Sequence, residues 1–124
     1  MKNIVVLISG SGSNLQAIID NCNTKYINAE ITCVISNNPG AYGLERATSA
    51  NINSIVINNK DYKSRSCFDS ELIKVLDDLN PDLIVLAGFM RILTEKLTSK
   101  FFGKIVNIHP SLLPKYPGLN THQE

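Results

Sequence analysis

Apolar residues in this chain fall into short continuous runs, separated by segments in which they recur every three or four positions. Ile4 to Ile8 is a run of five aliphatic residues, and such a run is typical of a strand that is buried on both faces. Four further runs follow it along the chain: Ile31 to Ile35, Ser54 to Ile57, Leu83 to Leu86 and Ile105 to Ile108. The pattern therefore predicts five short strands.

The segments between these runs have the 3.6-residue period of amphipathic helices. The first predicted helix has Leu15, Ile18, Ile19 and Cys22 on its apolar face. Ser13 or Asn14 is expected to cap its start. A second, short helix is predicted from Gly43 to Ala50.

Two more helices are predicted in the second half of the chain. The third has an apolar face made of Phe68, Leu72, Val75, Leu76 and Leu79. We expect it to end near Asn80, because Pro81 disfavours helical geometry in the residue before it. Thr94 is expected to cap a fourth helix that runs to about Phe102, and Gly103 to end it.

Strands that alternate with helices predict a single α/β domain, residues 1–124, with a doubly wound, mostly parallel sheet and right-handed crossovers. The character of the chain changes after Ile108, since three prolines and a glycine lie within residues 110–118. We expect residues 110–124 to form an ordered loop or a connector. No strand or helix closes the fold there, so we also expect the C-terminal part of the domain to be missing.

Composition narrows the function classes. Twelve basic residues are scattered and matched by eleven acidic ones, which argues against a nucleic-acid partner. The apolar runs are too short to cross a bilayer, and no signal-type segment opens the chain. Three widely spaced cysteines without a CxxC pair indicate reduced thiols in a cytoplasmic protein, with no metal site.

The turn after the first predicted strand, Ser9 to Asn14, is a candidate anion site. Its small residues would let backbone N–H groups approach a phosphate, and the following helix adds its positive end. It is a poor match to a dinucleotide site, since Leu15 stands where a third glycine is needed and the second strand ends in Ser36 rather than an acid. The alternative is a plain strand-to-helix turn.

Two other candidate places follow predicted strands. The segment Ala87 to Leu93 could hold a flat heterocycle between its backbone and its apolar side chains; the alternative is core packing of Phe89, Ile92 and Leu93 with Arg91 at the surface. In the last strand, Asn107 and His109 should share one face, because side chains alternate. An amide beside an imidazole can stabilise an oxyanion and move a proton; the alternative is a structural Asn and a surface His.

Four blocks of the sequence resemble one known family. They are Gly10-Ser11-Gly12-Ser13-Asn14-Leu15-Gln16-Ala17-Ile18, Gly43-Leu44-Glu45-Arg46-Ala47, Leu86-Ala87-Gly88-Phe89-Met90-Arg91-Ile92-Leu93, and Asn107-Ile108-His109-Pro110-Ser111-Leu112-Leu113-Pro114-Lys115-Tyr116-Pro117-Gly118. In this order they resemble the phosphoribosylglycinamide formyltransferase family, which has a Rossmann-like fold. The last block is the most specific, since the wider superfamily shares only its Asn-x-His and Ser-Leu-Leu-Pro elements.

This resemblance implies a monomeric or homodimeric enzyme that moves a formyl group from 10-formyltetrahydrofolate to the amine of phosphoribosylglycinamide, without a metal. It implies catalytic roles for Asn107 and His109, which would stabilise the tetrahedral oxyanion. It implies that the phosphoribosyl substrate is bound by Gly12, Ser13 and Asn14. For folate binding it implies Arg65, Met90, Arg91, Ile92, Leu93 and Asn107.

Other functions stay open at the level of sequence. Methionyl-tRNA formyltransferases and formyltetrahydrofolate hydrolases belong to the same superfamily, and a truncated, non-catalytic phosphate-binding module is a further alternative. The resemblance also implies a catalytic Asp that lies beyond residue 124. We therefore expect the isolated 124 residues to be poorly stable and nearly inactive.

Overall fold

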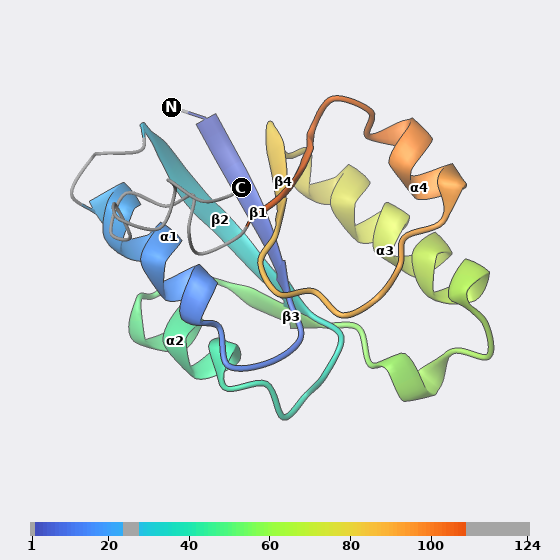
Figure 1. Cartoon of the computed structure of the whole chain (residues 1–124), viewed down its shortest axis with the longest axis horizontal. Coiled ribbons are helices and arrows are strands. Elements are labelled where there is room, and N and C mark those ends of the chain that lie inside the picture. Colours follow the sequence, from blue (N-terminus) through green and yellow to red (C-terminus); the bar gives the residue numbers. More distant parts are fainter. Residues whose placement is uncertain (1, 24–27, 109–124) are drawn as a thin grey trace, which may run out of the picture.

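A five-stranded parallel sheet forms the centre of the molecule (Figure 1). The computed structural model describes residues 2–23 and 28–108. In chain order the strands are β1 (Lys2–Ile8), β2 (Ala29–Ser36), β3 (Ser54–Val56), β4 (Leu83–Leu86) and β5 (Ile105–Asn107). Their order in the sheet is β3-β2-β1-β4-β5. The predicted strands are all present, and each begins and ends within two residues of its predicted limits.

Helices cover both faces of the sheet, as the doubly wound prediction requires. The helices are α1 (Ser13–Asn23), α2 (Gly43–Ser49), α3 (Arg65–Leu79) and α4 (Glu95–Lys100), with a short 3₁₀ helix, η1 (Asn59–Asp61). Figure 1 shows α1 and α2 on one side of the strands and α3 and α4 on the other. None of the helices in the described residues is both long and apolar enough to cross a membrane.

Three helix ends differ in detail from the prediction. The α1 cap was predicted one or two residues too late, because the Gln16 N–H already donates to the Gly12 carbonyl (2.8 Å) and the helix begins at Ser13. α3 begins before its apolar stripe, where the Ser64 hydroxyl accepts from the Cys67 N–H (3.1 Å). α4 ends at Lys100, short of Phe102. The Ser64 cap lies outside the apolar stripe, which explains the earlier start of α3.

Alternation along β1 divides the core into two layers. Ile4, Val6 and Ile8 pack with α1 and α2, whereas Val5 and Leu7 pack with α3 and α4. Each of these five residues is at most 3% exposed. The apolar run that opens the chain is therefore buried on both faces, as expected for the middle strand of a parallel sheet.

A shift of register in the β1–β2 pair was not foreseen. Ile4 pairs with Ile31, but Val5 pairs with Cys33, so Thr32 is an extra residue on β2. The Thr32 hydroxyl contacts the Ile4 carbonyl oxygen (3.4 Å). This bulge places Ile31 and Cys33 in opposite layers of the core, although two residues so spaced in a regular strand would share a face.

The chain changes direction across the sheet at β1. From β1 it passes through β2 to β3 with α1 and α2 on one face, and then returns through α3 to β4, which pairs with the other side of β1. The loops that follow β1 and β4 therefore leave towards opposite faces. In open α/β sheets such a divergence at the carboxyl ends of two neighbouring strands is the usual position of a ligand site.

We predict that Leu72→Ala lowers the free energy of unfolding by about 2–5 kcal/mol, because Leu72 of α3 is fully buried between the helix and the sheet. Urea denaturation monitored by circular dichroism measures the change. Lys74→Ala on the exposed side of the same helix is the control and should stay within about 0.5 kcal/mol of the parent. Equal losses in both variants would contradict this description of the core.

Candidate functional site at the carboxyl edge of the sheet

Each described part of the predicted site lies at the carboxyl edge of the sheet. The glycine turn, residues 9–12, follows β1; the loop of residues 87–94 follows β4; and Asn107 is the last residue of β5. The turn and the loop touch, since the Ser9 hydroxyl oxygen accepts a hydrogen bond from the Met90 N–H (2.8 Å). Two segments about eighty residues apart in sequence are thus joined at the divergence between β1 and β4.

Four successive carbonyl groups of the glycine turn are held by donors from the protein. The Ser9 oxygen accepts from Asn38 Nδ2 (3.3 Å), and the Gly10 oxygen accepts from the Gly43 N–H (3.0 Å). The Ser11 oxygen accepts from Arg46 Nε (2.7 Å). The Gly12 oxygen accepts from the Gln16 N–H (2.8 Å). The donors come from α1, α2 and the loop after β2, so three parts of the chain fix the orientation of this turn.

The opposite sides of the same peptide groups carry the N–H groups of residues 10–13. In a trans peptide the N–H and C=O groups point in opposite directions, so the four carbonyl bonds direct the N–H groups of residues 10–13 away from those donors. These N–H groups meet no acceptor among residues 2–23 and 28–108. Asn14 Oδ1 is buried and also lacks a partner there. A row of free donors at a helix start suits an anion such as a phosphate.

Two glycines allow the turn to lie directly against α2. Gly12 has φ +76°, in the left-handed region that favours glycine. A Cβ on Gly12 would lie 2.6 Å from the Gly43 Cα, and a Cβ on Gly43 would lie 3.3 Å from the Gly12 Cα. The backbone of the turn and the start of α2 are therefore in direct contact, and a side chain at Gly12 would separate them.

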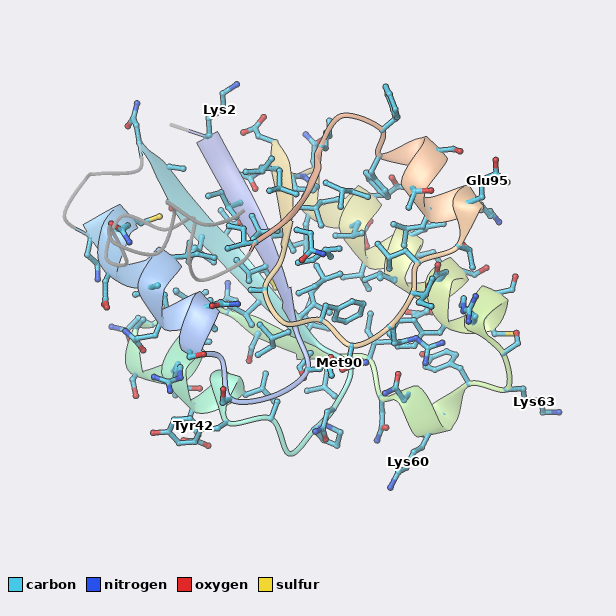
Figure 2. The ribbon with its side chains drawn as sticks, in the orientation of Figure 1. Lys2, Tyr42, Lys60, Lys63, Met90 and Glu95 are labelled. Carbon is cyan, nitrogen blue, oxygen red and sulfur yellow. The ribbon has the colours of Figure 1, made fainter. Side chains whose placement is uncertain are left out.

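The loop after β4 presents apolar side chains to solvent. Met90 is 81% exposed and Ile92 is 71% exposed, and Figure 2 shows Met90 close to the end of β1. Phe89 and Leu93 pack against the α3 and α4 layer instead. The alternative in which Ile92 is in the core and Arg91 is at the surface is therefore wrong on both residues, because Arg91 is the side chain that turns inward.

Arg91 anchors the loop to the rest of the fold. Its Nη1 donates to Asn59 Oδ1 (2.8 Å), and its guanidinium carbon lies 4.1 Å from the centroid of the Phe68 ring. Asn59 Oδ1 also accepts from Asn37 Nδ2 (3.3 Å). Because the Arg91 guanidinium is engaged in this network, it does not face a ligand. The backbone of the loop and its exposed apolar side chains are the groups that can cover a flat ligand.

A buried carboxylate holds the far end of the loop. Asp69 is 1% exposed, and its Oδ2 accepts from the Thr94 N–H (2.6 Å). We did not predict this residue or Asn59. Asp69 has a signal in the sequence, because it lies four positions before Ile73 on the apolar side of α3, where an acid needs a partner. Asn59 has none, since a polar residue in a short connection is ordinary.

The remaining predicted residues are placed less closely together. Arg65 is the exposed first residue of α3, one turn before Phe68, and no hydrogen bond or ion pair joins it to residues 90–93 in the described part of the chain. Asn107 is exposed and pairs with Leu86 of β4. Ile108 packs into the α1 and α2 layer of the core, whereas Leu86, the pairing partner of Asn107, packs into the α3 and α4 layer. The alternation expected along the last strand is therefore present between residues 107 and 108. His109 lies outside the described residues.

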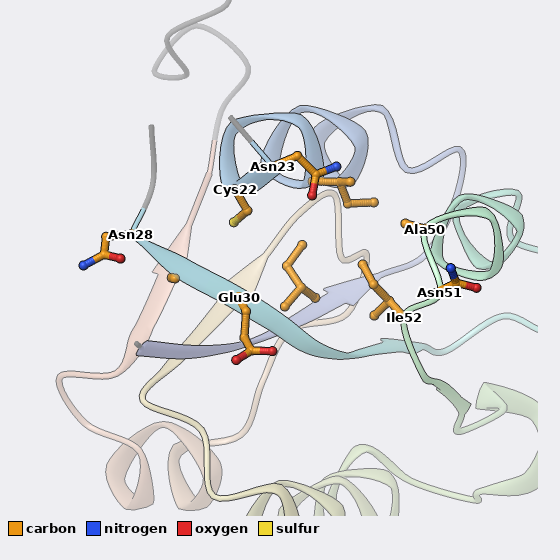
Figure 3. A pocket seen from close by; sticks show the side chains of 10 residues that line it. Cys22, Asn23, Asn28, Glu30, Ala50, Asn51 and Ile52 are labelled. Atoms are coloured by element: carbon orange, nitrogen blue, oxygen red, sulfur yellow. The ribbon is translucent and has the colours of Figure 1, made fainter. Parts of the chain in front are cut away.

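A hollow of about 350 Å³ lies away from this edge, at the amino end of β2 (Figure 3). It is lined by the ends of α1 and α2 and by the start of β2, including Cys22, Glu30 and Ile52. Burial raises the pKa of the Cys22 thiol, and burial also raises the pKa of the Cys33 thiol, against the lowering effect of a hydrogen bond with the Val34 backbone. Raised pKa values disfavour the thiolate, so neither cysteine is equipped as a nucleophile.

Within the described residues, no three His, Cys, Asp or Glu side chains are grouped so that they could hold a metal ion. The edge of the sheet instead offers a turn with free N–H donors beside a loop with exposed apolar side chains. The first suits an anionic group and the second a flat, partly apolar molecule. The arrangement can therefore bring two such ligands together at the ends of β1 and β4.

Comparison with known proteins gives consistent matches. The formyl transferase family matches residues 2–124. Phosphoribosylglycinamide formyltransferase of Escherichia coli is 54% identical over 98% of this chain, and the trifunctional purine biosynthetic protein adenosine-3 of Homo sapiens is 49% identical over 98%. Glycinamide ribonucleotide transformylase 1 of Symbiobacterium toebii superposes with a TM-score of 0.84 at 46% identity, covering 96% of this chain and 56% of that one. The chain spans 58% of the bacterial and 12% of the human relative.

We predict that Asp69→Ala frees the loop that follows β4, because the Thr94 N–H then loses its acceptor and becomes a partly buried, unpaired donor. Hydrogen exchange followed by mass spectrometry or NMR should show the Thr94 amide exchanging about tenfold faster or more. Asp69→Asn keeps an oxygen acceptor at the same place and is the matched variant, with a smaller effect. Unchanged protection in Asp69→Ala would show that the loop does not depend on this bond.

Proposed function

This chain belongs to the formyl transferase family, and from that membership we propose that it forms the substrate turn and the oxyanion site of a phosphoribosylglycinamide formyltransferase. The reaction moves a formyl group from 10-formyltetrahydrofolate to the amine of phosphoribosylglycinamide in purine biosynthesis. The observation that carries the proposal is 54% identity over nearly the whole chain to a relative of that name. The anion-binding geometry of the glycine turn supports the same substrate.

Gly12, Ser13 and Asn14 bind the phosphate of phosphoribosylglycinamide in this proposal. The free N–H groups of the turn and the positive end of α1 favour a dianionic group there. Asn14 Oδ1 is a buried acceptor without a partner in the described residues, so it can pair with a hydroxyl or N–H group of the phosphoribosyl substrate rather than with the phosphate oxygens. The contact between Gly12 and Gly43 keeps the turn small enough for the phosphate to approach the backbone.

The folate binds across the loop after β4. Met90, Arg91, Ile92 and Leu93 supply this pocket, with backbone groups that pair with the edge of the pterin ring and with the exposed Met90 and Ile92 side chains against its faces. Arg65 at the start of α3 supplies a positive charge for the acidic tail of the folate. The Ser9–Met90 hydrogen bond supports the proposal, since it joins the two substrate segments.

Asn107 and His109 stabilise the transition state. The neutral amine of the substrate attacks the formyl carbon, and the carbonyl oxygen becomes an oxyanion. The Asn107 amide and the protonated His109 imidazole donate hydrogen bonds to that oxyanion. The attacking amine loses a proton, the bond between the formyl carbon and the folate nitrogen breaks, and that nitrogen receives a proton as it leaves. The formyl group stays on the amine. The proposal requires neither a metal nor a covalent enzyme intermediate.

The proposal extends to the setting of the enzyme. Three free cysteines suit the reducing cytoplasm, where disulfides are rare, and de novo purine synthesis uses soluble small-molecule substrates. We propose a monomer or a homodimer without a nucleic-acid partner, in keeping with the balanced charge of the chain.

We predict that Asn107→Ala in the complete encoded protein lowers kcat on the order of 100- to 1000-fold, because one oxyanion donor is lost. His109→Ala should abolish most of the activity as well. Formyl transfer can be measured by the absorbance change of the folate product. Asn107 is exposed, so its removal leaves no cavity and the thermal midpoint should hold.

Thr98→Ala is the control for this pair, since Thr98 lies on the exposed side of α4 and its hydroxyl donates to the Glu95 carbonyl of the same helix, away from the site. It should turn over like the parent protein. Near-normal turnover in Asn107→Ala or His109→Ala would refute the assignment of the oxyanion site. A parent protein that folds but transfers no formyl group would refute the function itself.

A further inference from the structure

Arg46 is attached to the glycine turn from the opposite side of the proposed phosphate. Its Nε donates to the Ser11 carbonyl oxygen (2.7 Å), and its Nη1 lies 3.4 Å from Gln16 Oε1. The guanidinium carbon also lies 5.0 Å from the centroid of the Tyr42 ring. One side chain of α2 thus contacts the turn, the first part of α1 and the residue that precedes its own helix.

The bond to Ser11 differs from the other three that hold the turn. Two of those three are backbone bonds, from Gly43 and Gln16, and the third, from Asn38, is longer at 3.3 Å. The Arg46 bond is short and its donor is charged, which makes it the stronger of the two side-chain bonds. It is therefore the one through which a substitution can change the turn without changing the backbone.

The bond acts on a specific N–H group. Ser11 and Gly12 share a peptide plane, so holding the Ser11 oxygen towards Arg46 directs the Gly12 N–H to the other side. Gly12 can rotate about both of its dihedral angles more freely than any other residue, and its φ of +76° is one of several conformations open to it. A restraint on this peptide group is needed for its N–H to face a ligand before the ligand arrives.

We propose that Arg46 is a positioning residue that favours binding of the phosphate-bearing substrate. It holds the Ser11–Gly12 peptide group in the orientation that directs the Gly12 N–H towards the phosphate. The inference rests on the function proposed above and deepens it. It states that a residue outside the pocket raises the affinity for phosphoribosylglycinamide and leaves the affinity for 10-formyltetrahydrofolate unchanged. Arg46 does not touch the phosphate; it acts through the backbone of the turn.

The spacing in α2 fits this role. Gly43 and Arg46 are three positions apart and so lie on one side of the helix. Gly43 has no side chain, which allows the turn to lie against the start of α2. Arg46 donates to the Ser11 carbonyl of that turn. Lysine cannot replace the arginine fully, because one ammonium group cannot match the two-pronged geometry that reaches both Ser11 and Gln16.

The test compares Arg46→Met and Arg46→Lys with the parent in the complete encoded protein. For phosphoribosylglycinamide, kcat/KM should fall about tenfold or more in Arg46→Met, as expected for the loss of one charge-assisted hydrogen bond. It should fall less in Arg46→Lys. For the same amine without its phosphate, kcat/KM should stay within about twofold, as should the KM for 10-formyltetrahydrofolate, since neither ligand uses the Gly12 N–H group that Arg46 orients.

Lys74→Met is the matched control, because it removes one exposed positive charge from α3 on the other face of the sheet. This variant should leave kcat/KM for both amines and the KM for 10-formyltetrahydrofolate unchanged, which would exclude a general effect of lost positive charge on catalysis. Equal losses with the phosphorylated and unphosphorylated amines in Arg46→Met would show a merely structural role and overturn the inference. If Arg46→Met does not fold, Arg46→Lys decides: a selective loss with the phosphorylated amine supports the inference, and no selective loss overturns it.

A second measurement separates this inference from the function. Inorganic phosphate is added to the parent and to Arg46→Lys, and the rise in thermal midpoint is recorded. A rise in the parent that is reduced in the variant supports the positioning role even if no formyl transfer is found. Formyl transfer by the parent with equal phosphate effects in both proteins would leave the proposed function standing and overturn the role of Arg46.

Discussion

Burial of β1 on both faces is the constraint on which the rest of the structure depends. Its alternating side chains supply the centre of each core layer, and both of its edges are paired, with β2 on one side and β4 on the other. The strand therefore has no freedom to shift, and its carboxyl end is a fixed point. The glycine turn begins from that point, and the loop after β4 begins beside it because Leu86 pairs with Leu7, which is why the two segments meet.

Rigidity at this edge comes from side chains that hold backbone groups. Arg46 holds the Ser11 carbonyl, Ser9 holds the Met90 N–H, and Asp69 holds the Thr94 N–H. The Arg46 and Asp69 bonds fix irregular segments to the helices α2 and α3, and the Ser9 bond joins the two irregular segments to each other. A site built this way is preorganised, since less ordering of the loops remains to be done when substrates bind.

The general architecture could be predicted because it depends on local patterns. Runs such as Ile4 to Ile8 and the helical spacing of Phe68 and Leu72 report burial directly, since burial of apolar residues is the main driving force for folding. The turn after β1 and the loop after β4 were also located, because parallel sheets bind ligands at the carboxyl ends of their strands. The bulge at Thr32 was not, since pairing register depends on a neighbouring strand.

By itself the sequence determined the doubly wound α/β fold, the position of the glycine turn and the family, because each is written in contiguous residues. Only the tertiary structure decided that Arg91 turns inward onto Phe68 while Ile92 faces solvent, and that Asn59, Asp69 and Arg46 hold the two loops. The physical reason is that a hydrogen bond needs only two atoms within reach. Which distant polar residues come within reach is set by how the helices pack, and that packing leaves no periodic signal along the chain.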